Sequence, residues 1–365
     1  MFTKSETLKI KGIAILFLFF HHMYSSVGAI LDHGAKFPVG LEVIAHLALC
    51  LRICVFIFSF LTCYGLSLQY QKVLEQRGSP LKFIVYRYIR GLAPFWIITL
   101  ITWAVYIVVP NSPGYPNGWT LKSLPYMLGD FFAVLELFGQ SQYMINGLAW
   151  YMNLLVVQIV LLPLLFPLVK KSGLAVIPIT LVLYQSLPSV CRSPWGGEYK
   201  LYLFSMELGI LMAVNQSFPS AEEWYNRLRS YKKPLLGFGL MLCSVFLPYL
   251  AIYKLKDNSY GTYSLLFTLG GMSAVFFSFL CIRWSYLEKV LALLGKYSGT
   301  MFLTHMFVIF NLKDIVFHFS SPIIQILSLV AITLIIAVCI EYIKKMIHYD
   351  LFINRLCKPF REKTT

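Results

Sequence analysis

Apolar residues recur along the whole chain in runs close to the length that crosses the hydrocarbon core of a bilayer as a helix. Short segments rich in Lys, Arg, Pro or Gly separate these runs. A helix satisfies every backbone hydrogen bond within itself, as the bilayer requires. The pattern predicts an all-α, polytopic membrane helix bundle of about ten transmembrane helices, which cover roughly residues 12–30, 45–70, 92–109, 148–169, 173–190, 201–214, 235–253, 262–282, 291–311 and 323–343.

The segment 110–147, between the third and fourth predicted helices, is irregular. Pro110, Pro113, Gly114 and Pro116 interrupt any helix at its start. An amphipathic run follows over Leu121–Phe138, which predicts a re-entrant or interfacial helix on the outer side.

The composition leaves no room for a separate soluble domain. Of 365 residues, 58% are hydrophobic and only 13% are charged. We therefore expect one transmembrane domain over residues 1–345 and a short basic cytoplasmic tail over residues 346–365. A cleaved signal peptide is the alternative for the N-terminus, because lysines precede its first apolar stretch. The histidine pair inside that stretch argues against this alternative, since ionisable groups are costly in a membrane helix and are usually functional.

The net charge of +15 is explained by topology. With both termini in the cytoplasm, 23 of the 31 Lys and Arg residues fall in cytoplasmic segments, as the positive-inside rule predicts. The basic balance therefore requires no nucleic-acid partner. The eight cysteines include no C-x-x-C pair and lie mostly in apolar runs, so we interpret them as buried hydrophobes and expect no metal site.

Lys11 and His22 are the first candidate pair. Eleven residues make about three helical turns, so both side chains share one helix face, with His22 roughly 16 Å further along the axis. A histidine near mid-membrane can take a proton from an acceptor hydroxyl, or it can serve only as a hydrogen-bonded core residue. Its neighbour His21 points about 100° away, so we expect only one of the two to face a pocket.

Arg87 and Arg90 are the second candidate pair, in Tyr86-Arg87-Tyr88-Ile89-Arg90. Three residues apart, they share a helix face, and two planar guanidiniums suit bidentate phosphate binding. An ordinary positive-inside loop is the alternative. His305 is the third candidate, about 14 Å along a helix from Lys296, and is either a second pocket residue or a core histidine.

Taken together, these stretches resemble the membrane-bound acyltransferase 3 family. Lys11-Gly12 followed by His21-His22 is similar to its first-span signature, and Arg87 with Arg90 matches its R-x-x-R motif. Leu294-Gly295 through His305 resembles its late L-G-x-x-S…L-x-H pattern. Two weaker similarities are the aromatic run Phe56–Gly65 and the site Ala149-Trp150-Tyr151.

The resemblance implies an O-acetyltransferase of cell-surface glycans in the bacterial cytoplasmic membrane. The donor would be cytoplasmic acyl-CoA, usually acetyl-CoA, held by Arg87 and Arg90, and no metal would be needed. His22 would act as general base or relay the acyl group, with Lys11 and His305 as further catalytic residues. The acceptor would be a glycan or a lipid-linked sugar, and membrane lipids would surround the protein.

Two other functions are compatible with the same residues. A proton-coupled transporter or flippase of an anionic amphiphile would also use buried histidines and basic loops. A family member that has lost activity and serves as a sensor or scaffold is the third possibility. Release of CoA that depends on acceptor distinguishes the enzyme from the transporter.

Overall fold

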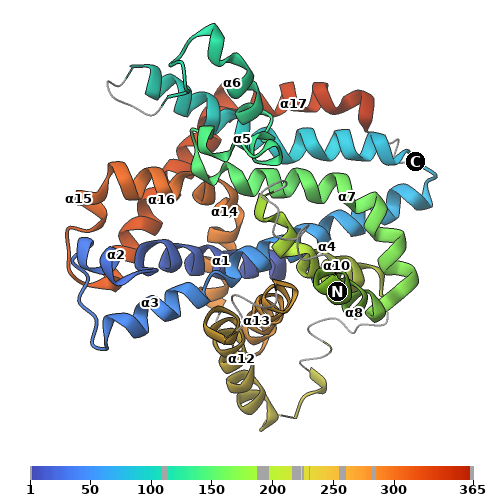
Figure 1. Ribbon diagram of the computed structural model, residues 1–365, viewed down its shortest axis with the longest axis vertical. Coiled ribbons are helices and arrows are strands. Elements are labelled where there is room, and N and C mark those ends of the chain that lie inside the picture. The colour runs from blue at the N-terminus through green and yellow to red at the C-terminus, as the bar shows by residue number, and fades with distance from the viewer. Residues whose placement is uncertain are drawn as a thin grey trace.

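The computed structural model describes residues 2–108, 114–186, 197–215, 223, 226–229, 231–254, 260–281 and 285–361. Pro110 and Pro113 lie outside these residues. All regular structure in the described part is helical, and Figure 1 shows the helices packed together as a bundle. The predicted all-α fold class is confirmed.

Fifteen α-helices carry the described chain: α1 (Lys4–Tyr24), α2 (Val27–Asp32), α3 (Leu41–Cys50), α4 (Ile53–Glu75), α5 (Pro80–Val108), α6 (Leu124–Phe131), α7 (Trp150–Ser172), α8 (Val176–Ser186), α10 (Leu203–Val214), α12 (Lys232–Lys254), α13 (Tyr260–Cys281), α14 (Ser285–Asn311), α15 (Lys313–Val316), α16 (Pro322–Met346) and α17 (Tyr349–Cys357). Short 3-10 turns join several of them, including η4 (Gly147–Ala149) before α7, η6 (Gly197–Tyr202) before α10 and η7 (Lys358–Phe360) after α17.

Every predicted transmembrane segment contains a helix. Within the described residues, five helical segments are both long and apolar enough to cross a membrane: Leu41–Glu75, Pro80–Val108, Ala149–Ser186, Lys232–Lys254 and Pro322–Met346. The helices α8 and α10 have 11 and 12 residues, fewer than the roughly 20 of a full span. The number of ten spans and the cytoplasmic location of both termini therefore stay predictions.

Two predicted helices are divided in the structure. The first ends at Tyr24, and α2 starts afresh after Ser26, whose side chain accepts a hydrogen bond from the backbone of Ala29 at 3.1 Å. The second is divided at Leu51 and Arg52 into α3 and α4. Conversely, α5 begins at Pro80, twelve residues before the predicted start, because proline suits the first turn of a helix.

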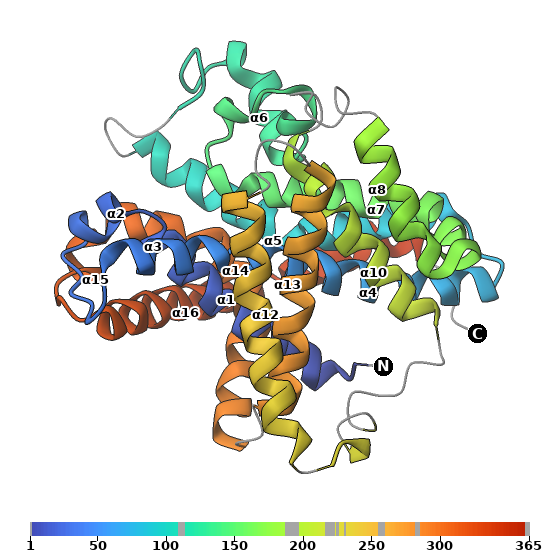
Figure 2. The same cartoon turned by 60° about the horizontal axis from the view of Figure 1, so that its bottom comes forward.

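The helix α4 forms the centre of the bundle. It packs against α1, α7, α10 and α13, and the apolar window of the segment that contains it is 67% buried. The corresponding window of α12 is only 22% buried. Figure 2 shows α12 and α13 side by side at the front of the bundle. The exposed Leu235, Phe238 and Phe246 of α12 suit contact with lipid.

Candidate functional site

The helices α1 and α14 meet backbone to backbone at two glycines. A Cβ added to Gly12 would overlap the carbonyl oxygen of Leu291, and one added to Gly295 would overlap that of Leu8. Close crossings of this kind are typical of membrane helices, where small residues let two backbones approach. Lys9 of α1 also forms an ion pair with Glu288 of α14 at 3.0 Å. The two helices are thereby fixed to each other near their N-terminal ends.

The contact has the same register on both helices. Gly12 packs on Leu291, one turn before Gly295, and Gly295 packs on Leu8, one turn before Gly12. The two helices therefore cross as a two-fold related parallel pair. Both helices carry the pattern Leu-x3-Gly-x9-His, which ends at His22 on α1 and at His305 on α14. Equal spacing from the crossing places the two histidines at the same height, roughly 15 Å beyond the glycines.

His22 and His305 are accordingly neighbours, with ring centroids 4.9 Å apart. His305 is fully buried, and its Nδ1 lies 2.6 Å from the carbonyl oxygen of Phe302. Because a carbonyl oxygen can only accept, Nδ1 carries the proton and Nε2 carries the lone pair. Nε2 is buried and has no hydrogen-bond partner in the described structure, so it is available as a base beside His22.

His21 faces a different part of the protein. Its Nδ1 lies 2.8 Å from the carbonyl oxygen of Ala48 on α3, so its ring serves to join α1 to α3. Of the two adjacent histidines, His22 is the one whose side chain reaches a cavity. The expectation that only one of them faces a pocket matches this geometry.

His22 lines a cavity of about 780 Å³. Most of its wall is apolar and comes from the C-terminal halves of α5 and α14, the segment 145–150 and α16. The lining consists of His22, Ile98, Ile101, Thr102, Val105, Tyr106, Ile145, Asn146, Gly147, Leu148, Trp150, Leu303, Thr304, Met306, Phe307, Phe310, Asn311, Ile336 and Ile340. A few hydroxyls and amides therefore converge with one imidazole in a largely apolar site, the usual composition of a ligand pocket.

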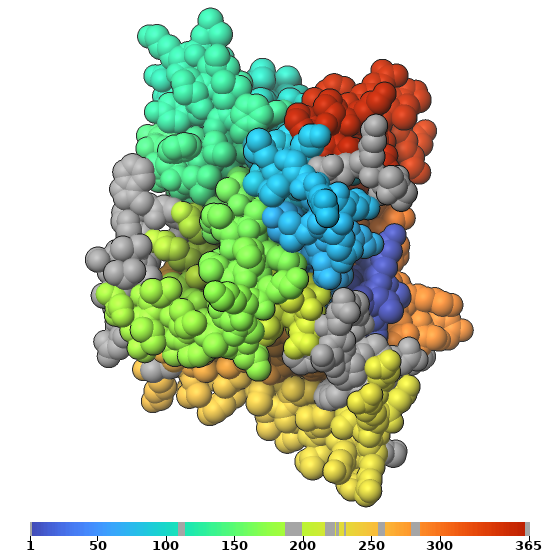
Figure 3. Space-filling model, turned by 90° about the vertical axis from the view of Figure 1, so that its right-hand side faces the viewer, coloured from blue at the N-terminus to red at the C-terminus, as the bar shows by residue number. Residues whose placement is uncertain are grey.

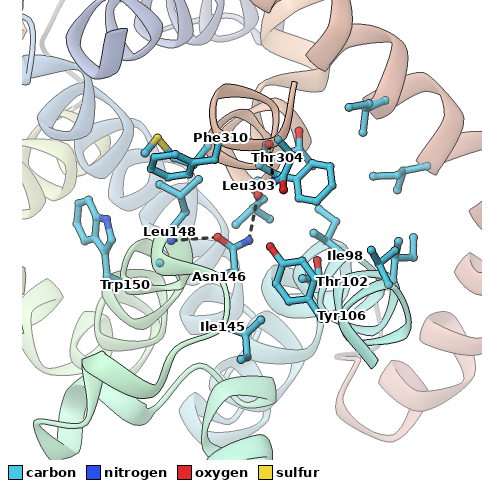
Figure 4. Close-up of a pocket in the computed structure, with 18 of the residues that line it drawn as sticks. Ile98, Thr102, Tyr106, Ile145, Asn146, Leu148, Trp150, Leu303, Thr304 and Phe310 are labelled. Carbon is cyan, nitrogen blue, oxygen red and sulfur yellow. Dashed lines mark hydrogen bonds between the residues drawn. The ribbon is translucent and has the colours of Figure 1, made fainter. Parts of the chain in front are cut away.

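Asn146 holds the non-helical wall of this cavity. Its Nδ2 donates to the carbonyl oxygen of Leu303 on α14 at 3.0 Å, and its Oδ1 accepts from the backbone of Leu148 at 3.0 Å. Figure 4 shows this amide between Tyr106 of α5 and Leu148, with both hydrogen bonds drawn. The sequence analysis missed Asn146, although Asn-Gly directly before Leu148-Ala149-Trp150 indicates a turn that sets a helix start.

Asp130 supports the same wall of the cavity through the backbone of Ile145. Its Oδ2 accepts from the hydroxyl of Tyr115 at 2.9 Å and from the backbone of Ile145, a cavity residue, at 3.2 Å. Burial raises the pKa of Asp130 to about 6, and these two hydrogen bonds oppose the rise. The predicted amphipathic run, Leu121–Phe138, forms η1 (Leu121–Ser123), α6 and η2 (Leu135–Phe138) around this carboxyl.

Tyr151 and the aromatic part of α4 pack on α14 just before His305. The ring of Tyr151 lies 4.9 Å from that of Phe302, and the ring of Phe58 lies 6.3 Å from it. Phe302 is the residue whose carbonyl oxygen fixes His305. The two aromatic stretches noted in the sequence therefore support the histidine pair, and Trp150 of the second stretch also lines the cavity.

Arg87 and Arg90 lie on the first half of α5. The guanidinium carbon of Arg87 is 5.0 Å from the ring centre of Tyr86, and that of Arg90 is 5.6 Å from it, so one tyrosine supports both. Neither arginine forms an ion pair with a carboxylate in the described part of the chain. The Nε atoms of both are buried and lack a hydrogen-bond partner there. The pair thus offers unneutralised charge and free donors, which suits an anionic ligand.

Four of the five predicted site residues form two pairs. His22 and His305 are brought together, and Arg87 and Arg90 share one end of α5. Lys11 is half-buried beside the Gly12 crossing, and it is not part of the cavity lining. Within the described residues, no group of three or more His, Cys, Asp or Glu side chains is placed to hold a metal ion.

Comparison with known proteins gives one finding. A family model described as an acyltransferase domain matches residues 10–342, which is most of the chain and includes all five predicted site residues. Searches of curated proteins and of solved structures gave no match to the chain.

Proposed function

We propose, because this chain belongs to the acyltransferase 3 family, that it transfers an acetyl group from cytoplasmic acetyl-CoA to a hydroxyl of a cell-surface or lipid-linked glycan. Membership of this family supports acyltransferase activity in a membrane protein. The donor, the acceptor and the site residues are our proposal. The observation that carries it is the juxtaposition of His305 with His22, which lines a cavity.

The donor end of the proposed pathway is the arginine pair. In the predicted topology the first half of α5 lies at the cytoplasmic side, where acyl-CoA is found. Arg87 and Arg90 would bind phosphate groups of the nucleotide, because their charge is not cancelled by a carboxylate among the described residues. The pantetheine arm would then lead the thioester into the bundle towards His22.

The acceptor end is the cavity. In the same topology the C-terminal halves of α5 and α14 lie towards the outer side, so the cavity would receive the glycan there. Asn146, Thr304 and Tyr106 supply hydrogen-bonding groups for a sugar hydroxyl. The apolar remainder would exclude water, which limits hydrolysis of the thioester.

The proposed chemical step is a proton-coupled acyl transfer. His22 removes the proton of the acceptor hydroxyl while the hydroxyl oxygen attacks the thioester carbonyl carbon. The carbon–sulfur bond then breaks, and the proton passes from the imidazole to the CoA thiolate that leaves. The lone pair on His305 Nε2 gives His22 a neighbouring proton acceptor. The same geometry serves a relay in which the imidazole carries the acyl group between donor and acceptor.

Mass spectrometry of the isolated surface glycan tests this proposal. Cells with and without the gene should differ by acetyl esters on a defined glycan residue. Complementation with the wild-type gene should restore the esters, and the His22→Ala gene should not. Identical glycans in cells with and without the gene would contradict the proposal.

A further inference from the structure

The segment after α16 folds back onto the helix that carries the arginine pair. His348, between α16 and α17, adopts the left-handed conformation with φ of 52°, which is uncommon for a residue with a side chain and turns the chain sharply. The helix α17 then packs against α5 and α16. Figures 1 and 3 show this C-terminal segment (red) against the first half of α5 (cyan to light blue).

The docking of α17 is specified by its sequence. Tyr349, Ile353 and Cys357 recur every four residues and therefore share one helix face. Ile353 and Cys357 are 2% and 1% exposed. The hydroxyl of Tyr349 donates to the carbonyl oxygen of Ala93 on α5 at 2.8 Å. The chain beyond the part that matches the family is therefore a built element of the protein.

The helix α17 makes polar contact with the arginine pair. Nη2 of Arg90 donates a hydrogen bond to Oδ1 of Asn354. An amide oxygen fixes the guanidinium without cancelling its charge, whereas a carboxylate at the same position would neutralise it. The Nε of Arg90 has no hydrogen-bond partner among the described residues.

We propose that α17 is one wall of the donor-phosphate site and that Asn354 is a positioning residue for Arg90. This inference rests on the proposed function, in which Arg87 and Arg90 bind acyl-CoA. An arginine held in place before the ligand arrives loses less conformational entropy on binding than a free one. Asn354 thereby tightens donor binding and contributes nothing to the chemical step.

The substitutions Asn354→Ala and Asn354→Asp test this proposal in the purified full-length protein in lipid nanodiscs, with CoA as the binding probe. Asn354→Ala should weaken CoA binding about two- to tenfold, the net effect of one hydrogen bond. Asn354→Asp should weaken it about ten- to a hundredfold, because the carboxylate cancels the charge that the phosphate needs. In both variants KM for acetyl-CoA should rise while kcat at saturating donor is maintained.

The aspartate variant separates positioning from a merely structural role. Asp is nearly isosteric with Asn and would pair more strongly with Arg90, so the docking of α17 should persist or improve. A purely structural contact would then leave CoA binding unchanged or better. Asn226→Asp, at an exposed asparagine of another segment, controls for the change in net charge. Cys357 lies on the buried face of docked α17, whereas Cys243 and Cys339 are exposed. Maleimide labelling, with the modified cysteine identified by peptide mass spectrometry, therefore reports whether each variant remains docked.

The outcomes are distinguishable. Normal or tighter CoA binding by both Asn354 variants, with weak binding by Arg90→Ala, would overturn the role of α17 and leave the donor site in place. If Arg87→Ala and Arg90→Ala also bind CoA normally, the donor assignment itself fails, and the proposal for Asn354 fails with it. Should Asn354→Ala expose Cys357 to labelling, the docked aspartate variant decides the question.

Discussion

The histidine pair and the arginine pair are held by different kinds of contact. His22 and His305 depend on two backbones in direct contact at Gly12 and Gly295, where no side chain can adjust. Arg87 and Arg90 depend on flexible side chains: the ring of Tyr86, which contacts both, and Asn354 on a separate helix, which contacts Arg90. Main-chain contacts therefore fix the histidine pair, whereas side-chain contacts position the arginine pair.

The difference corresponds to what each step needs. Acyl transfer requires the base within hydrogen-bonding distance of a hydroxyl, and a misplacement of about 1 Å can cost on the order of a hundredfold in rate. Phosphate binding by charge tolerates small displacements, because Coulomb attraction changes slowly with distance. We therefore expect substitutions at the histidine pair to act on kcat and those at the arginine pair to act on KM.

The substitution His22→Ala should have the largest effect. Loss of a positioned general base costs about 10²–10⁴ in rate, and loss of a covalent relay costs more. His21→Ala is the matched control, because its ring bonds to Ala48 and does not line the cavity. Acetate on the isolated glycan is measured, with protein level checked in the same membranes. An active His22→Ala protein beside an inactive His21→Ala protein would reverse our choice of histidine.

The substitutions Gly12→Ala and Gly295→Ala should follow, with about a hundredfold loss of kcat, because a new Cβ forces the two backbones apart and separates the histidines. Overpacking should also destabilise the protein by about 1–3 kcal/mol. Gly299→Ala is the control on α14, since nothing lies within 4 Å of its added Cβ. Equal activity of all three variants would show that the crossing does not determine the site.

The substitutions Arg87→Ala and Arg90→Ala should raise KM for acetyl-CoA about ten- to a hundredfold, since a charge-assisted phosphate contact contributes roughly 1.5–3 kcal/mol. Lysine should restore only part of the affinity, because it lacks the planar fork. Steady-state kinetics over donor concentration separates KM from kcat. An unchanged KM in the double alanine variant would exclude these arginines from donor binding and leave them only a role in setting the topology.

Asp130 should give the smallest effect, on stability. Its pKa of about 6 lies above the ordinary value of 3.8, so the folded protein retains a proton that the unfolded chain has lost. Its contribution to stability is therefore full below about pH 4 and is lost as the pH rises through about 6, a change of about 2–3 kcal/mol at most. Asp130→Asn should remove this dependence from thermal unfolding measured between about pH 4 and pH 7. An unchanged pH dependence in the variant would exclude Asp130 as its source.

Properties of a single helix could be predicted from the sequence. The run of apolar residues predicted α1, and helical periodicity predicted that His21 and His22 face different surroundings. The same reasoning predicted that Arg87 and Arg90 share a helix face, and the continuous helix α5 carries both. These inferences need only the rise and turn of one helix.

Contacts between distant helices could not be predicted in this way. The crossing of α1 with α14 depends on which helices are neighbours, which periodicity does not indicate. The pattern Leu-x3-Gly-x9-His occurs on both helices. It indicates a symmetric crossing only once the two helices are known to be neighbours. The docking of α17 is similar: Tyr349, Ile353 and Cys357 mark an apolar face, and the sequence does not name its partner.

The most direct test of the central claim uses purified protein in proteoliposomes, with labelled acetyl-CoA on the side of the arginine pair and glycan acceptor on the other. We expect release of CoA thiol that depends on acceptor, equal in amount to the acetate esterified to the glycan, and absent with His22→Ala. Movement of acceptor across the membrane without release of CoA would contradict the account and identify a transporter.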